Sequence, residues 1–169
     1  MALTDHNTVE GALRLKDMEP ELTIVGEEIK TTEGEIIGLF LNHGIARDLP
    51  PETVLDLIHE QGGLAYLAHP LDPWRYHFSV ERVRQLAPMV DIIEGYNTHC
   101  PEDRNAAAKR LAGDLGLPWA TGSDSHSIVE LGYAWQEMPG FSGPNSFLAS
   151  LEQAQSLVLP RPPELRHRP

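Results

Sequence analysis

Short apolar runs alternate along the chain with segments that carry apolar residues at helical spacing. The runs are rich in Ile, Val, Leu or aromatic side chains, which is typical of buried strands: Leu22–Val25, Ile36–Leu41, Leu64–Ala68, Val90–Glu94 and Pro118–Thr121. Helix-start signals stand between the runs, at Asn7-Thr8-Val9-Glu10, Pro51, Ser79 and Pro101-Glu102-Asp103. This alternation predicts an α/β fold with a mainly parallel sheet.

Two regions depart from the alternation. The segment Glu28–Leu41 contains Thr31-Thr32-Glu33-Gly34, which predicts a hairpin turn between two strands. From Gln155 onward, prolines and arginines replace any core-forming periodicity, which predicts a flexible tail. We therefore expect one domain over residues 1–154, followed by a Pro/Arg-rich tail over residues 155–169.

Polar residues that could bind a metal follow the predicted strands. They are Thr4-Asp5-His6, Glu27-Glu28, His69-Pro70, Asn97 with His99, and Ser123-Asp124-Ser125-His126. Active sites of barrels and open α/β sheets lie at the carboxyl ends of the strands. The sequence therefore predicts a functional site at this edge of the sheet.

The two-residue period of extended backbone narrows the choice of ligands. Asp124 and His126 are two positions apart, so they can face one metal centre together. Asp5 and His6 are adjacent, so only one can face the centre, and the other can orient it through a hydrogen bond. Glu27 and Glu28 pose the same choice, and periodicity leaves both pairs open.

Imidazole and carboxylate groups without thiolate suit Zn²⁺, Mn²⁺ or Fe. Such ligands could hold a cluster whose bound water has a pKa lowered towards about 7. We expect His69, Asp124 and His126 to share a centre with His6 and Glu28. Weaker site candidates are His43, Asn97 and His99. Arg75 offers a planar fork that could bind a substrate phosphate.

Composition excludes several other functions. The 169 residues carry 13 Lys+Arg against 25 Asp+Glu, a formal net charge of −12, which disfavours binding to long nucleic acids. The sequence shows neither a membrane-spanning apolar stretch nor a secretory leader, so we expect a cytoplasmic protein. The single cysteine, Cys100, excludes an internal disulfide and a cysteine-rich zinc module.

Four motifs in order resemble the PHP (polymerase and histidinol phosphatase) superfamily, especially its small stand-alone members. They are Thr4-Asp5-His6-Asn7, Gly26-Glu27-Glu28-Ile29, His69-Pro70 and Gly122-Ser123-Asp124-Ser125-His126. The resemblance implies a distorted, TIM-like barrel of seven β/α units with two or three divalent metal ions. It selects His6 over Asp5 and Glu28 over Glu27 as ligands, with His69, Asp124 and His126 completing the set. It also implies hydrolysis of a phosphate ester by a metal-bound hydroxide.

The superfamily's opening His-x-His motif has no counterpart here, because the chain begins at the second motif. We therefore expect the chain to lack a first strand–helix unit of about 30 residues. Three functions remain open. The leading one is hydrolysis of a small phosphomonoester or nucleotide, with catalysis resting on Asp124, His126 and Arg75. The others are a 3′–5′ exonuclease or oligonucleotide phosphodiesterase, and a non-catalytic remnant that binds metal or a partner.

Overall fold

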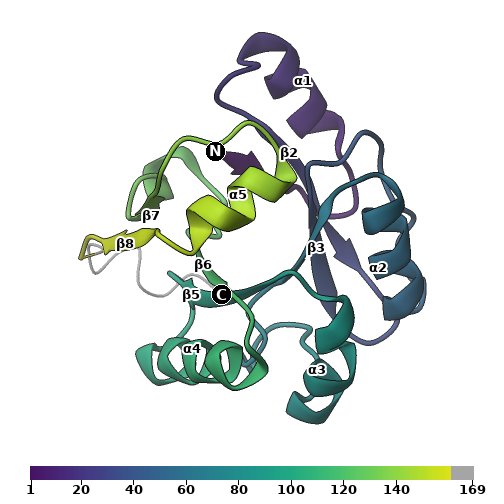
Figure 1. The fold of residues 1–169 in the computed structure, drawn as a ribbon, viewed down its shortest axis with the longest axis vertical. Helices are drawn as coiled ribbons and strands as arrows, with labels where there is room; N and C mark the ends of the chain where they lie inside the picture. The colour runs from purple at the N-terminus through teal and green to yellow at the C-terminus, as the bar shows by residue number, and fades with distance from the viewer. Residues whose placement is uncertain (161–169) are drawn as a thin grey trace.

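The computed structural model describes residues 1–160 and has a mixed α/β fold (Figure 1). A curled, half-barrel sheet contains six strands in chain order: β1 (Ala2–Leu3), β2 (Ile24–Lys30), β3 (Glu35–Leu39), β4 (Leu64–Leu67), β5 (Ile92–Asn97) and β6 (Trp119–Gly122). A second, two-stranded sheet pairs β7 (Ala134–Glu137) with β8 (Gln155–Val158). The helices are α1 (Glu10–Met18), α2 (Pro51–Glu60), α3 (Val80–Leu86), α4 (Glu102–Leu115) and α5 (Pro144–Leu151), with 3₁₀ turns η1 (Ala87–Met89) and η2 (Ile128–Glu130).

Most neighbouring strands of the large sheet are parallel, but β3 runs against both of its neighbours. The predicted hairpin between β2 and β3 is confirmed. The Thr31 hydroxyl accepts hydrogen bonds from the amides of Glu33 and Gly34, which closes the turn. Because β3 is antiparallel, its end at Leu39 pairs with the start of β4 at Leu64. The loop after β3 therefore lies at the opposite edge of the sheet from the loops after β4, β5 and β6.

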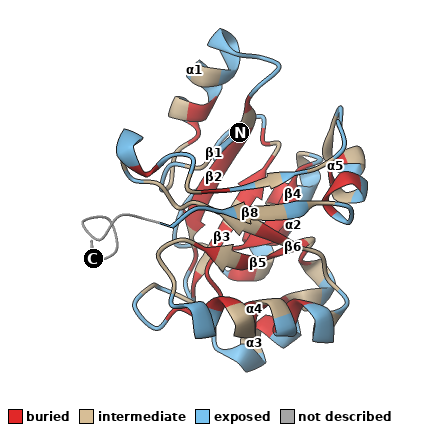
Figure 2. Cartoon of the chain, turned by 90° about the vertical axis from the view of Figure 1, so that its left-hand side faces the viewer, coloured by how far each residue is buried: buried red, intermediate tan, exposed pale blue. Residues whose placement is uncertain are grey.

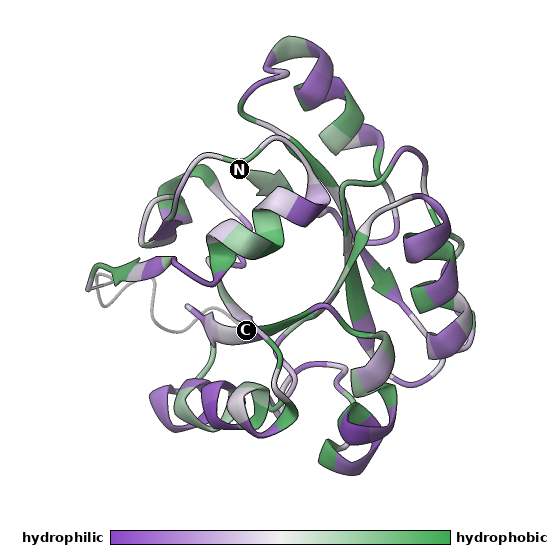
Figure 3. Cartoon of the chain, in the orientation of Figure 1, coloured by the Kyte–Doolittle hydropathy of each residue, from purple (hydrophilic) through white to green (hydrophobic). Residues whose placement is uncertain are grey.

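Helices α1 to α4 lie outside the curled sheet, whereas α5 lies across its inner side (Figure 1). The strands are largely buried, and the exposed residues gather on the outer helix faces, where hydrophilic residues predominate (Figures 2 and 3). The outer core between sheet and helices includes Ile29, Ile58 and Val83. The inner core includes Phe147 and Leu151 of α5. None of the helices within residues 1–160 is long and apolar enough to cross a membrane.

Several strand boundaries in the structure differ from those predicted from the sequence. Strand β2 continues to Lys30, beyond the expected run Leu22–Val25, so Glu27 and Glu28 lie within a strand rather than after one. The expectation of a flexible tail from Gln155 is wrong for its first residues, because Gln155–Val158 form β8 against β7. The remainder of that prediction, residues 161–169, lies outside the described residues.

Candidate metal centre

Glu28 joins the turn after β1 to the end of β4. Its Oε1 lies 3.0 Å from Nε2 of His69, and its Oε2 lies 3.5 Å from Nδ1 of His6. The backbone supports this arrangement, because His6 and Glu28 form an isolated parallel bridge beyond β1. Glu35, at the start of β3, places its Oε2 3.8 Å from the same His69 nitrogen. The antiparallel hairpin thus adds a second carboxylate beside Glu28.

Asp124 and His126 form the other side of the cluster. The Asp124 Oδ2 lies 2.7 Å from Arg75 Nη2 and accepts a longer hydrogen bond, 3.3 Å, from Asn97 Nδ2. The His126 Nδ1 lies 3.6 Å from Asp124 Oδ1. The His126 ring centroid is 6.0 Å from that of His6 and 6.0 Å from that of His99. The structure therefore gathers every metal ligand proposed from the sequence, together with Arg75, Asn97 and His99.

Glu94 is a buried carboxylate at the centre of this arrangement. It accepts hydrogen bonds from the His69 amide at 2.7 Å, from the Tyr66 hydroxyl at 3.0 Å and from Asn97 Nδ2 at 3.0 Å. A β-carbon at position 122 would collide with its Oε1, so Gly122 leaves room for the carboxylate. Glu94 therefore links the end of β4 to the end of β5 and packs against Gly122 of β6.

The cluster carries more negative than positive charge. Burial would lower the pKa of His69, but its hydrogen bond to Glu28 and the nearby carboxylates outweigh burial and raise that pKa to about 9. Burial raises the pKa of Glu94, and burial with the charge of Glu28 raises the pKa of Glu35. Burial would also raise the pKa of Glu28, but His69 outweighs it and lowers that pKa. These shifts show that the carboxylates attract a positive charge, here the His69 proton.

The donor set fits a divalent cation. The carboxylates Glu28, Glu35 and Asp124 lie beside one guanidinium and several imidazoles, and carboxylate with imidazole is the combination that suits Zn²⁺, Mn²⁺ or Fe. The His69 Nδ1 is buried without a hydrogen-bond partner. Loss of the imidazolium proton would leave one nitrogen of this ring free to bind a cation.

The turns that carry these side chains share an unusual backbone. Asn7, His69 and Asp124 have φ values of 56°, 28° and 48°, in the left-handed region that non-glycine residues seldom adopt. Each of the three either belongs to the cluster or directly follows a residue that does. Residues held in such conformations cost about 1–3 kcal/mol each and cluster at functional sites.

Three of the residues considered above lie elsewhere. Glu27 points away from Glu28, and its carboxylate accepts the Ile45 amide at 2.9 Å, so it does not orient Glu28 as expected. The Asp5 carboxylate lies against Gly11 near the start of α1, while its backbone oxygen accepts the Glu28 amide at 3.1 Å. Asp5 therefore supports the Glu28 backbone.

His43 is exposed in the loop after β3, where its amide donates to Gln61 Oε1 at the edge of the sheet away from the cluster. The weak prediction of a site role for His43 rested on its position directly after a strand. Since β3 is antiparallel, this loop emerges at the other edge.

Sequence reasoning missed Glu35, Glu94, Tyr66 and Glu130. Glu94 left a signal, because an acid within an otherwise apolar strand is buried only with partners. A two-residue period would place Glu94 and Asn97 on opposite faces of β5. A bulge between Glu94 and Tyr96 shifts the register, and the two side chains meet on one face.

The comparisons with known proteins agree with this architecture. Residues 102–156 match the family described as PHP-associated. Over 163 residues the chain is 35% identical to the uncharacterized protein MJ0417 of Methanocaldococcus jannaschii, covering 89% of this chain and 65% of that protein. Over 76 residues it is 51% identical to MJ1587 of the same organism, covering 43% of this chain and 44% of that protein. The chain thus spans less than two thirds of either relative.

Three solved structures share the fold. A two-domain protein of Bacteroides vulgatus, described as containing a predicted PHP-like metal-dependent phosphoesterase, aligns with a TM-score of 0.57 and 19% identity over 78% of this chain and 44% of its own. PsfC of Pseudomonas syringae gives 0.60 and 18% identity, covering 79% of this chain and 58% of its own. A Bifidobacterium adolescentis protein, named as a candidate metal-dependent phosphoesterase, gives 0.60 and 13% identity, covering 75% and 77%.

The curled α/β fold of this chain is shared with these three structures. The family match over residues 102–156 and the shared fold together support a PHP-domain protein.

Proposed function

We propose that this chain hydrolyses phosphate esters with divalent metal ions held by His6, Glu28, His69, Asp124 and His126. The observation that carries the proposal is the convergence of these groups from separate strands around an excess of negative charge. The raised pKa of His69 is consistent with that excess, because its causes are the hydrogen bond to Glu28 and the nearby carboxylates. The phosphoesterase names of two structural neighbours support the same chemistry.

Manganese, zinc or iron bound here would supply a hydroxide nucleophile and polarise the phosphate oxygens. The chain's own groups position the substrate. The Arg75 guanidinium lies beside Asp124 at 2.7 Å, where its planar fork can hold a phosphate next to the ligands. Cys100 does not act as a nucleophile, because burial and Asp72 raise the pKa of its thiol far above the ordinary value.

Among small phosphate esters, the loop after β4 favours nucleotides. Its backbone around Trp74 is held by Asp72, whose side chain accepts the Trp74 amide and whose carbonyl accepts the Arg75 amide. The Trp74 side chain nevertheless is 86% exposed. An exposed aromatic ring next to a phosphate-binding arginine can stack on a nucleobase. The distorted barrel of seven units and the cytoplasmic location stay predictions.

The test is a substrate panel with metal-depleted protein to which Mn²⁺, Zn²⁺ or Fe²⁺ is returned. We expect hydrolysis of p-nitrophenyl phosphate, a nucleoside monophosphate and glycerol phosphate only with metal, and none of p-nitrophenyl acetate. The variant Trp74→Ala should raise KM for the nucleotide and leave glycerol phosphate unchanged. Preference for a short oligonucleotide would favour the phosphodiesterase alternative. Metal binding without turnover would favour the non-catalytic alternative, and ester hydrolysis that survives chelation would contradict the proposal.

A further inference from the structure

Glu130 is a buried acid in a turn whose apolar residues are exposed. Within η2, the residue exposures are 87% for Ile128 and 60% for Val129, but only 3% for Glu130. Burying a carboxylate instead of isoleucine or valine costs free energy unless the carboxylate has a specific partner. The inverted pattern therefore indicates that Glu130 is directed inward for a purpose other than core packing.

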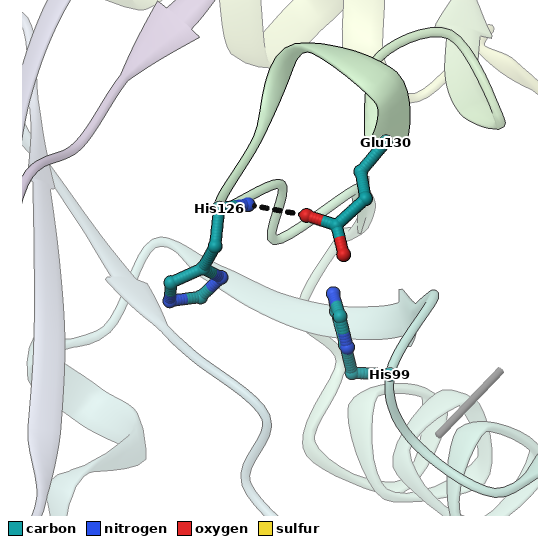
Figure 4. Close-up of side chains that lie close together, drawn as sticks. All are labelled: His99, His126 and Glu130. Carbon is teal, nitrogen blue, oxygen red and sulfur yellow. Dashed lines mark hydrogen bonds between the residues drawn. The ribbon is translucent and has the colours of Figure 1, made fainter. Parts of the chain in front are cut away.

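The contacts of Glu130 lead to two histidines of the cluster. Its Oε2 accepts the backbone amide of His126 at 2.8 Å, and its second oxygen points toward the ring of His99 (Figure 4). One ligand atom from each of His99, His126 and Glu130 lies within 4.8 Å of the others. The three residues come from the loop after β5, the loop after β6 and η2, so the tertiary fold assembles them.

This group is distinct from a second one formed by His6, Glu28 and Glu35, whose ligand atoms meet the same distance limit. His126 lies between the two, because its ring is 6.0 Å from both the His6 and the His99 ring. The His126 amide holds one oxygen of the Glu130 carboxylate, so the position of this side chain is fixed beside both histidines. Two imidazoles and one carboxylate are a common ligand set for zinc and non-haem iron.

We propose that Glu130 is part of the metal centre, fixing His126 through the backbone amide and completing a cation position with His99 and His126. This inference rests on the proposed function, since it concerns the same cluster. It adds a ligand that no motif of the sequence indicated. It also assigns the Glu130 charge a role in binding the cation, beyond that of a hydrogen-bond acceptor.

The variant Glu130→Gln separates these two roles. Its side-chain oxygen can still accept the His126 amide, but the negative charge is lost. We expect Glu130→Gln to bind about one metal ion per chain fewer than the wild type, with an unchanged circular dichroism spectrum. Elemental analysis and the absorption spectrum of the Co²⁺-loaded protein measure this loss. The control Glu60→Gln, on the exposed end of α2, should keep the full metal content.

A second variant protects the test against a folding defect. His99→Ala should lose the same metal ion, and the double variant His99→Ala/Glu130→Gln should lose no more than either single variant, because one ion is shared. Full metal content and wild-type affinity in Glu130→Gln would overturn the inference and leave Glu130 as a backbone cap. Additive losses would overturn it as well. A wild-type chain that binds no cation would instead refute the proposed function itself.

Discussion

The two ends of the sheet's inner face are built from the same strands but have opposite chemistry. At one end, Glu28, His69 and Glu94 meet in a hydrogen-bonded cluster. At the other end, Phe147 and Leu151 of α5 pack against apolar side chains of the strands. Ionic and hydrogen-bonded contacts therefore hold one end of the inner face together, and burial of apolar side chains holds the other end together.

Tyr66 shows how closely these regions adjoin. Its ring belongs to the apolar inner core, while its hydroxyl donates to Glu94 Oε1 at 3.0 Å. The comparison indicates that packing at the apolar end raises the free energy of unfolding, whereas strained turns and buried carboxylates at the charged end lower it. The ligand residues carry buried charge and lie in turns with a strained backbone, and both features cost free energy of folding. The packing of α5 offsets that cost. The following variants test this division.

The largest effect is expected from Asp124→Asn, which removes charge at the site but tolerates the same left-handed backbone. We expect metal affinity to fall by more than roughly 100-fold and hydrolysis to drop to the level of the metal-free protein. The matched control is Asp48→Asn, because Asp48 also has a positive φ, 62°, but pairs with Arg47 in solvent. Equal metal content in both variants would contradict the assignment of Asp124 as a ligand.

The variant Phe147→Ala should destabilise the apolar end of the inner face. The side chain is buried in the inner core, so its truncation should lower the free energy of unfolding by about 3–5 kcal/mol. Metal content per folded chain should stay unchanged, because no cluster residue is removed. Urea unfolding measures the stability, with the exposed Met18→Ala as a control that should change it by less than about 0.5 kcal/mol. A loss of metal in folded Phe147→Ala would show that the two ends are not separable.

The pH dependence of the metal-free protein tests the charged end alone. The pKa of His69 is raised from 6.5 to about 9 in the folded chain, so its contribution to stability is complete below 6.5. That contribution is lost as the pH rises through about 9, because the proton leaves the folded protein. Urea unfolding in a chelator from pH 6 to pH 10 should show this decline, and saturating metal should reduce it.

His69→Asn provides the reference for that measurement, since asparagine tolerates the positive φ of 28° and has no titrating ring. The decline between pH 6.5 and 9 should be absent in this variant. It should persist in His59→Asn, because His59 is a more exposed histidine paired with Asp91. The same slope in His69→Asn as in the wild type would assign the pH dependence to other groups.

The smallest effect is expected at the contact between the two ends. Tyr66→Phe keeps the ring and removes the buried hydroxyl, so the free energy of unfolding should fall by about 1 kcal/mol. Tyr76→Phe removes an exposed hydroxyl that donates to the Thr32 carbonyl, and its cost should be smaller. Equal costs in the two variants would show that the bond to Glu94 gains nothing from burial.

The parts of the fold that depend on local patterns could be predicted from the sequence. Apolar runs located the strands from β2 to β6, and the cap at Ser79 is present, since its hydroxyl accepts the Arg82 amide at 3.1 Å. The residues of the ordered motifs, such as His69 and Asp124, come together as expected because parallel strands end at one edge of the sheet.

The features that were missed depend on irregularities that no periodicity encodes. A bulge in β5 turns Glu94 and Asn97 to the same side, and the reversed β3 brings Glu35 in and carries His43 away. Glu130 reaches the cluster through a 3₁₀ turn with no apolar pattern. In each case tertiary geometry overrides the local repeat.

The left-handed turns at Asn7, His69 and Asp124 have a consequence for how this protein can evolve. At Asp124, glycine or asparagine should increase the amount of folded protein in cells, because those residues relieve the backbone. His69 differs, because its raised pKa contributes stability that a substitution would remove. The same substitutions at Asp124 should abolish the proposed hydrolysis. In a saturation screen that scores abundance and turnover separately, the two rankings should therefore oppose each other at Asp124 and agree in the apolar inner core. Selection for stability alone would replace Asp124 early, at the expense of the proposed hydrolysis.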